Sequence, residues 1–434
     1  MSPRSPSSTT RRTLLGGCAV LVAGLAGCSQ LTSSDPFPSP KNAGEGWPHR
    51  FRDLGNTNAA PEGPESLTEQ WSRRVEARLD RPIVRDGTVI TVATTRKRRR
   101  SFRTRVLGID AETGDQQWTF DLQHVRRARI AAAVDDRVYI VGEELEDTRD
   151  ERLYAVDMDD SIAWRFEAEH LTAVAATAST VFASVRHGSV VALDASDGAP
   201  AARLHPAGWT VGRWLSDRTP IGRPTVLDGR VFAPFARYDT DREDSYYGDE
   251  IVAFDADGIV WKAPLDDVCF VDHVAAVDGT VYVLTMDQCP GDTEAISSSL
   301  AALDATSGER RWTRSIEGGL VSPVTVSGDA ITVAGGDVHT FDPDGDRRWR
   351  EQVFSGPPVI AGNRVYGRRT EDGAIDTVVA VDLETGESLD AHTFEHQLNR
   401  APVFADGRAV VRTLEYDRTE DGAEHVADRI HMLR

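Results

Sequence analysis

The chain has 434 residues, of which 69 are acidic and 49 are Lys or Arg, so its formal net charge is −20 at pH 7. This excess of acid argues against nucleic acid as a partner, because phosphate backbones are bound by surplus Lys and Arg. The apolar run at residues 13–27 is shorter than the ~20 residues that a helix needs to cross a bilayer. Its length therefore argues against a transmembrane helix.

The N-terminus carries the features of an export signal. Arg11 and Arg12 precede the apolar run, and Cys28 follows it in the sequence Leu-Ala-Gly-Cys. Twin arginines before a short apolar segment are typical of the Tat route, and this cysteine context is typical of a lipobox. We therefore expect a signal peptide at 1–27, a flexible tether at 28–46, and a lipid on Cys28 that anchors the protein to the outer face of the cytoplasmic membrane. The alternatives are an uncleaved anchor and plain secretion.

One phrase recurs along the rest of the chain. It is clearest at Gly108–Trp118 (GIDAETGDQQW) and Ala302–Trp312 (ALDATSGERRW), and looser copies occur at 155–164, 192–198, 253–261, 340–349 and 380–389. Upstream of each copy, two short β-branched runs flank Asp-Gly or a near equivalent, as at 82–93, which predicts a tight β-hairpin. The interval of about 40–50 residues fits a four-stranded propeller blade.

Eight such units predict an all-β fold, an eight-bladed propeller of four-stranded antiparallel blades over residues 47–434. The last unit ends after its third strand (Val426–Leu433), so we expect Leu67–Val75 to supply the fourth strand and close the ring. The recurrent tryptophans are expected to pack between neighbouring blades; they are Trp71, Trp118, Trp164, Trp261, Trp312 and Trp349. Ala202 and Asp390 stand at the equivalent position of two units, so we expect those two junctions to be weaker or filled differently.

Two cysteines remain for the folded part. Cys269 and Cys289 lie almost symmetrically about the Asp278-Gly279 turn, so a hairpin there would bring them opposite each other. We predict a disulfide, which an oxidising compartment permits. The alternative is a pair of free, buried thiols.

Long connections between the second and third strands of the blades suggest a binding face. They are expected at 94–105, 143–152, 236–250, 286–299, 368–377 and 415–424, with a further long connection at 205–222. In a propeller these segments emerge on one face, and binding residues favour loops above a rigid scaffold. The candidate residues of this face are Arg98, Arg99, Arg100, Trp209, Trp214, Tyr246 and Tyr247. The alternatives are a solvated basic segment paired with nearby acids, such as Glu143, and aromatics that only fill the channel mouth.

Signatures of catalysis and metal binding are missing from the sequence. It contains no G-x-S-x-G elbow, P-loop, H-E-x-x-H or C-x-x-C motif, and the acids at 239–249 lack the spacing of an EF-hand loop. Abundant acid together with only three lysines resembles the proteins of halophilic archaea, whose surface carboxylates keep them hydrated. We therefore predict no catalytic residue and no metal site.

The repeated A-x-D-x-x-T-G-x-x-x-W pattern resembles the PQQ-type β-propeller repeat family. Trp47, Phe51, Arg52 and Asn56–Asn58 also resemble the lead-in segment of that family. The family includes quinoprotein alcohol and glucose dehydrogenases, and the propeller lipoprotein of the bacterial outer-membrane assembly machinery, which binds no cofactor. The adjacent cysteine pair of the quinoprotein alcohol dehydrogenases has no counterpart here, and their Ca²⁺ ligands and catalytic Asp match no residue of this chain.

The resemblance therefore implies a non-catalytic, monomeric, membrane-anchored module that takes no cofactor and binds protein partners through its long-loop face. The alternative that it leaves open is a PQQ-dependent dehydrogenase of sugars or alcohols.

Overall fold

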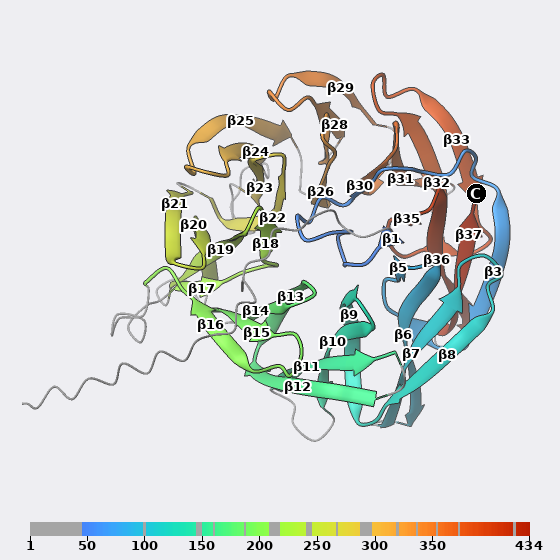
Figure 1. The fold of residues 1–434 in the computed structure, drawn as a ribbon. Coiled ribbons are helices and arrows are strands. Elements are labelled where there is room, and N and C mark those ends of the chain that lie inside the picture. The colour runs from blue at the N-terminus through green and yellow to red at the C-terminus, as the bar shows by residue number, and fades with distance from the viewer. Residues whose placement is uncertain are drawn as a thin grey trace, which may run out of the picture. The chain divides into compact units, whose positions relative to one another are not determined.

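In the computed structural model, the chain forms an eight-bladed β-propeller, as the sequence predicts (Figure 1). All described residues belong to one compact unit, Asp35–Arg434, and they cover 46–98, 101–144, 150–158, 161–185, 188–207, 218–239, 245–265, 268–286, 297–317, 321–335, 337–352, 355–371, 374–419 and 422–434. Within these ranges no helix is long and apolar enough to cross a membrane. The predicted signal peptide, with Arg11, Arg12 and Cys28, lies outside the described residues.

Each blade is an antiparallel meander that runs from an inner strand at the ring axis to an outer strand at the rim (Figure 1). The strands of the first four blades are, for blade 1, β4 (Arg78–Leu79), β5 (Ile83–Arg85), β6 (Thr88–Arg98), β7 (Ser101–Asp110) and β8 (Gln116–Leu122); for blade 2, β9 (Val125–Val134), β10 (Arg137–Glu144), β11 (Asp150–Asp157) and β12 (Ser161–Glu169); for blade 3, β13 (Leu171–Ala176), β14 (Thr180–Val185), β15 (Val190–Asp194) and β16 (Pro200–Leu204); and for blade 4, β17 (Arg218–Pro220), β18 (Thr225–Leu227), β19 (Arg230–Asp239), β20 (Ser245–Asp255) and β21 (Gly258–Pro264).

The remaining blades follow the same order. Their strands are, for blade 5, β22 (Phe270–Val277), β23 (Thr280–Met286), β24 (Ser297–Asp304) and β25 (Arg310–Glu317); for blade 6, β26 (Val321–Val326), β27 (Ile331–Ala334), β28 (Val338–Phe341) and β29 (Arg347–Glu351); for blade 7, β30 (Ser355–Ala361), β31 (Arg364–Glu371), β32 (Ala374–Asp382) and β33 (Ser388–Thr393); and for blade 8, β34 (Gln397–Leu398), β35 (Val403–Ala405), β36 (Arg408–Thr419), β37 (Gly422–Leu433) and β3 (Glu69–Val75).

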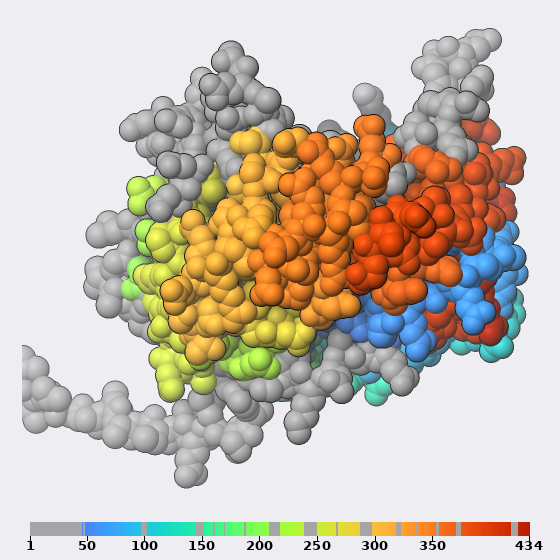
Figure 2. Space-filling view, turned by 90° about the horizontal axis from the view of Figure 1, so that it is seen from above, coloured from blue at the N-terminus to red at the C-terminus, as the bar shows by residue number. Residues whose placement is uncertain are grey.

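The outer strand of the last blade comes from the other end of the chain, as predicted. β3 pairs antiparallel with β37, with Trp71 opposite Met432 and Val75 opposite Asp428. Figure 2 shows the blue surface of the N-terminal strand directly beside the red C-terminal surface. This pairing closes the ring, so no blade is left with only three strands.

The tight turns between inner and second strands follow from Asp-Gly pairs. At Asp86-Gly87 both residues have positive φ, 46° and 69°, and the same holds for 228–229, 278–279 and 406–407. Two consecutive left-handed residues make the turn whose twist matches that of the flanking strands, and Asp and Gly tolerate this conformation. These turns all lie on one side of the ring, which we call the short-turn face.

The opposite side of the ring differs from the sequence prediction. The connection at 94–105 is not a loop, because β6 and β7 continue as a paired hairpin as far as Arg98 opposite Ser101. In blade 8 the pairing extends to Thr419 opposite Gly422. Similar extensions occur at β10/β11, β19/β20 and β31/β32. The prediction treated these segments as loops, but a hairpin with both sides in solvent accepts charged residues on either side while its backbone groups pair. We call this side the long-hairpin face.

Five of the six predicted rim tryptophans lie against a turn glycine of the following blade, whereas the ring of Trp118 contacts Gly108 of its own blade. Trp261 is buried, its Nε1 donates a hydrogen bond to the carbonyl of Ala305 at 3.0 Å, and its ring lies on Gly308. Glycine is required at position 308 for two reasons. A Cβ there would come within 2.6 Å of the Trp261 ring, and its φ of 75° is a left-handed conformation that favours glycine. The same tryptophan–glycine contact occurs at Trp71/Gly114, Trp164/Gly198, Trp312/Gly345 and Trp349/Gly386.

The two units without tryptophan precede blades 4 and 8. In these two blades the usual turn between the third and fourth strands is shorter or absent. Ala202 precedes blade 4, where a shorter turn connects β20 to β21 at Asp255–Gly258. Asp390 precedes blade 8, whose two outer strands, β37 and β3, are not consecutive in the chain and so have no turn between them. Asp390 instead accepts a hydrogen bond from the amide of Leu67 at 2.7 Å. At five of the other junctions the tryptophan and the turn glycine form a pair across neighbouring blades.

Candidate functional site

A segment without any repeat crosses the centre of the ring. Residues 46–60, which we call the axial segment, run from β1 (Gly46–Trp47), paired with β5 of blade 1, to β2 (Ala59–Ala60), paired with β30 of blade 7 (Figure 1). Between them, carbonyls of the segment accept hydrogen bonds from inner strands of four further blades, at Ala133 N to Pro48 O (2.7 Å), Val226 N to Leu54 O (2.9 Å), Ala276 N to Gly55 O (2.7 Å) and Val326 N to Thr57 O (2.8 Å). The segment therefore ties the blades together near the short-turn face.

Polar side chains hold the axial segment in its path. Asn56 and Asn58 both have a φ of 52°, a left-handed conformation that Asn adopts more readily than most residues. The Asn56 side-chain amide donates to Thr225 Oγ1 at 2.7 Å, and that of Asn58 donates to the Pro358 carbonyl at 3.0 Å. The Asp53 carboxylate accepts from the Thr57 amide at 3.0 Å. These contacts explain why an Asn-Thr-Asn sequence stands at this point.

His49 is fully enclosed by this arrangement. Its Nε2 donates to the Ala176 carbonyl of blade 3 at 2.7 Å. Burial, followed by the positive charge of Arg223, lowers its pKa from 6.5 to about 3. The imidazole is therefore neutral at physiological pH and serves as a structural hydrogen-bond donor.

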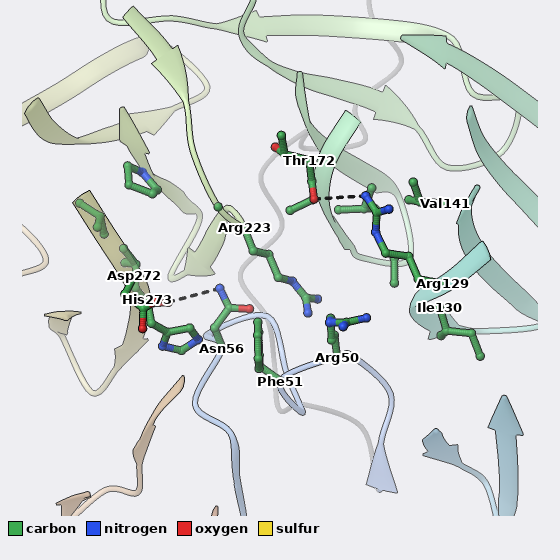
Figure 3. Close-up of a pocket in the computed structure, with 17 residues that line it drawn as sticks. Arg50, Phe51, Asn56, Arg129, Ile130, Val141, Thr172, Arg223, Asp272 and His273 are labelled. Atoms are coloured by element: carbon green, nitrogen blue, oxygen red, sulfur yellow. Dashed lines mark hydrogen bonds between the residues drawn. The ribbon is translucent and has the colours of Figure 1, made fainter. Parts of the chain in front are cut away.

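A cavity of about 300 Å³ lies between the axial segment and the inner strands of blades 2 to 5. Figure 3 shows the side chains that line it. The axial segment contributes Arg50, Phe51 and Asn56, and the polar residues that the blades contribute are Arg129, Thr172, Arg223, Asp272 and His273. We call this space the axial cavity. Its volume is at the lower end of the range for small-molecule sites.

Arg223 is the most unusual side chain of the axial cavity. It is only 8% exposed, and none of its three guanidinium nitrogens has a hydrogen-bond partner among the described residues. Burial lowers its pKa to about 9, with Asp53 opposing that shift and Arg50 adding to it. The group therefore still carries its positive charge at neutral pH.

The neighbouring side chains are partly engaged. Arg129 donates to Glu151 at 2.8 Å and to the Leu171 carbonyl at 2.9 Å. An Arg50 nitrogen lies 3.7 Å from an Asp80 oxygen. His273 packs edge-on against Phe51 with ring centroids 4.8 Å apart, and neither ring nitrogen has a hydrogen-bond partner among the described residues. Burial, followed by Arg223, lowers the pKa of His273 to about 3.

More arginines surround the axis. Arg81 is buried, and its pKa falls to about 9 because of burial and of the nearby charges of Arg50 and Arg400, which Asp80 partly offsets. Arg368 also has a lowered pKa, caused by burial and by Arg400. The axis is therefore locally basic in a chain whose net charge is −20.

None of the predicted binding-face residues is among the described residues that line the axial cavity. Arg99, Arg100, Trp209 and Trp214 lie outside the described residues, and for Arg98, Tyr246 and Tyr247 only the backbone, in β6 and β20, is described. Other arginines near the basic segment are paired with acids, since Arg103 lies 2.8 Å from Asp121, and Arg126 and Arg127 lie 3.0 and 3.1 Å from Glu143.

Only one of the two cysteines of the predicted disulfide is among the described residues. Cys269 is buried and is disulfide-bonded. Cys289 lies outside the described residues, so the pairing of these two stays a prediction.

The sequence did not mark the residues of the axial cavity as a site, although Phe51 and Asn56 belong to the lead-in segment that it singled out. Arg223 precedes an ordinary inner strand, and nothing in its neighbourhood marks it. The signal that could have found Arg50 and Asn56 was the lack of any copy of residues 47–60 elsewhere in the chain.

A quinone cofactor with Ca²⁺ is what the dehydrogenase alternative would require. Ca²⁺ takes six to eight oxygen ligands. Among the described residues, no three His, Cys, Asp or Glu side chains lie close enough together to hold a metal ion, and Asp272 is the one carboxylate that lines the axial cavity. The described residues therefore do not fit the metal, although arginines suit the carboxylates of such a quinone.

Comparisons with known proteins agree with the fold. Solved structures similar to this chain include a quinohemoprotein alcohol dehydrogenase from Comamonas testosteroni (15% identity, 91% of this chain and 81% of that chain, TM-score 0.60) and a europium-containing methanol dehydrogenase (13%, 91% and 99%, 0.59). The computationally designed Ika8 protein is similar too (13%, 85% and 99%, 0.54). At these identities the likeness shows the fold alone.

None of the curated protein sequences matches the chain. A family model described as outer membrane protein assembly factor BamB matches residues 64–146, 149–243, 247–352 and 334–428, which is most of the propeller. The chain therefore belongs to the PQQ-type propeller family that this model represents.

Proposed function

We propose that this protein is a non-catalytic, extracytoplasmic scaffold that binds protein partners through its long-hairpin face. The observation that carries the proposal is the uneven height of the hairpins on that face. β36 and β37 have 12 residues each, whereas β27 and β28 of blade 6 have four each. Hairpins of different length on a closed ring give this face a fixed, uneven shape. A surface of this kind can be complementary to one specific partner.

The rigidity of the ring supports this role. The axial segment bonds to inner strands around the ring, and the rim tryptophans bond across blade junctions. A platform of this kind presents its hairpins with little loss of conformational entropy on binding. The match to the model described as an outer membrane protein assembly factor agrees with a role in binding proteins.

We also propose that the protein is exported by the Tat route and anchored through a lipid on Cys28. The twin arginines, the short apolar run and the lipobox-like sequence support this. A Cys28→Ala variant should move from the membrane fraction to the soluble exported fraction. Retention of this variant in the membrane would contradict lipid anchoring.

The second candidate is a PQQ-dependent dehydrogenase of sugars or alcohols. The arginines of the axial cavity favour it, since they suit a ligand with several carboxylates.

A titration separates the two candidates. The full chain is incubated with PQQ and Ca²⁺, freed of unbound quinone, and assayed for bound-quinone absorbance and for dye-linked oxidation of alcohols and sugars. The scaffold proposal expects no dye-linked activity above that of heat-treated protein. One bound quinone per chain with substrate-dependent dye reduction would overturn it.

A further inference from the structure

We propose that the axial cavity is a binding site for a compact oxyanion, a small polycarboxylate or phosphate, held between Arg223 and Arg50. Figure 3 shows both guanidinium groups converging inside the cavity. The proposal goes beyond the scaffold role and stands or falls independently of it.

The first reason is the state of Arg223. A buried guanidinium group without hydrogen bonds is unfavourable, because it has lost its hydration and gained nothing in return. All three nitrogens of Arg223 are in this state, and the residue is 8% exposed. An oxyanion would supply the acceptors that the described part of the protein does not.

The second reason is that nearby carboxylates are already engaged. Asp53 accepts hydrogen bonds from Arg52 at 2.9 Å and from the Thr57 amide at 3.0 Å. Asp80 accepts from the Ile130 amide at 2.8 Å while it lies 3.7 Å from Arg50. Asp53 offsets part of the charge of Arg223 at a distance, but neither acid accepts a hydrogen bond from its guanidinium group.

The remaining walls decide the class of ligand. His273 faces the cavity with two ring nitrogens that lack partners among the described residues, and a neutral imidazole can donate one hydrogen bond to an anion. Asp272 lies beside His273, so the favourable position for the anion is on the Arg223 and Arg50 side. Positive charge on two sides excludes a cation, and the 300 Å³ volume limits the ligand to a small molecule.

The test measures binding of phosphate, malonate and citrate to the full chain by calorimetry and by thermal shift, at constant ionic strength maintained with chloride. Wild-type protein should bind at least one of these anions at one site per chain. Phosphate binding alone would identify the ligand as a phosphate, and binding of malonate or citrate alone would identify it as a carboxylate.

Arg223→Gln should weaken that binding at least tenfold, and so should Arg50→Gln. The matched control is Arg203→Gln, which removes an exposed arginine from outer strand β16 and should bind like wild type. Because the guanidinium group of Arg223 has no hydrogen-bond partner among the described residues, Arg223→Gln should unfold at the wild-type temperature or above it. No binding of any of the three anions to wild type, or equal binding to wild type and folded Arg223→Gln, would overturn the proposal.

Discussion

The rim and the axis of this propeller are built from two kinds of sequence. The rim consists of copies, in which a tryptophan of one blade meets the turn glycine of the next, as Trp261 meets Gly308. The axis is crossed by residues 46–60, which have no copy, and these contribute Arg50 and Asn56 to the axial cavity. In a repeat protein, copied residues serve the contacts that every unit needs. Residues that break the repeat are therefore the better guide to a site.

The largest expected effect is at the rim. Trp261→Ala should lower the free energy of unfolding by about 3–5 kcal/mol, because it empties a buried junction between blades 4 and 5. Trp118→Ala is the matched comparison, since Trp118 is half-buried and the glycine that lies on its ring, Gly108, belongs to its own blade. Denaturant unfolding should show a clearly smaller loss for Trp118→Ala. Equal losses would mean that the contact across the junction is not what stabilises the ring.

The contribution of the tryptophan–glycine contact can also be measured by changing the glycine. Gly308→Ala should cost about 2–4 kcal/mol, because it combines a strained positive φ with a clash against Trp261. Gly279→Ala has a similar φ of 70° but nothing within 4 Å of the new Cβ, so only the backbone cost of about 1 kcal/mol remains. Thermal or denaturant unfolding measures both. If the two variants lost the same stability, the tryptophan contact would be unimportant.

At the axis, the expected effect depends on pH. The pKa of His273 is lowered to about 3, mainly by burial, so the folded state stays neutral while the unfolded chain takes up a proton below pH 6.5. Stability is therefore lost as the pH falls from 6.5 toward 3, and at pH 5 this residue alone accounts for roughly 2 kcal/mol. His273→Phe should remove this part of the pH dependence in unfolding curves recorded between pH 7 and pH 5.

The control for that experiment is Phe51→Leu. It alters the ring that packs against His273 but removes no titratable group, so it should keep the wild-type pH dependence at a lower overall stability. A pH dependence that is unchanged in His273→Phe would show that His273 is not held neutral.

The smallest effect concerns the path of the axial segment. Asn56→Gly keeps the left-handed backbone but loses the hydrogen bond to Thr225, and should cost about 1 kcal/mol. Asn56→Ala loses both and should cost about 1 kcal/mol more. Unfolding of the two variants measures the difference. If Asn56→Ala were as stable as Asn56→Gly, the left-handed conformation would not be required at this position.

The repeat was enough to predict the fold, because every unit carries its own turn chemistry. Asp-Gly pairs specify hairpins locally, and the missing fourth strand of the last unit pointed to Leu67–Val75. The long hairpins were misjudged because charged residues such as those at 96–100 suit exposed strands as well as loops. The axial cavity could not be predicted, since it depends on contacts such as that of Asn56 with Thr225, far apart in sequence, which exist only once the ring is closed.

The most direct test of the scaffold role changes the long-hairpin face and leaves the ring intact. In one variant, residues 95–103 become Asn-Gly, which joins the paired Thr94 and Thr104, and residues 416–426 become Asn-Gly, which joins Glu415 and Ala427. A control, Glu112→Gln, alters the short-turn face. Proteins crosslinked to each form in its own membranes are then quantified by mass spectrometry. We predict that partners of wild type are retained by the control and lost by the shortened form, although both unfold like wild type. Full retention of these partners by the shortened protein would contradict the proposal that this face binds them.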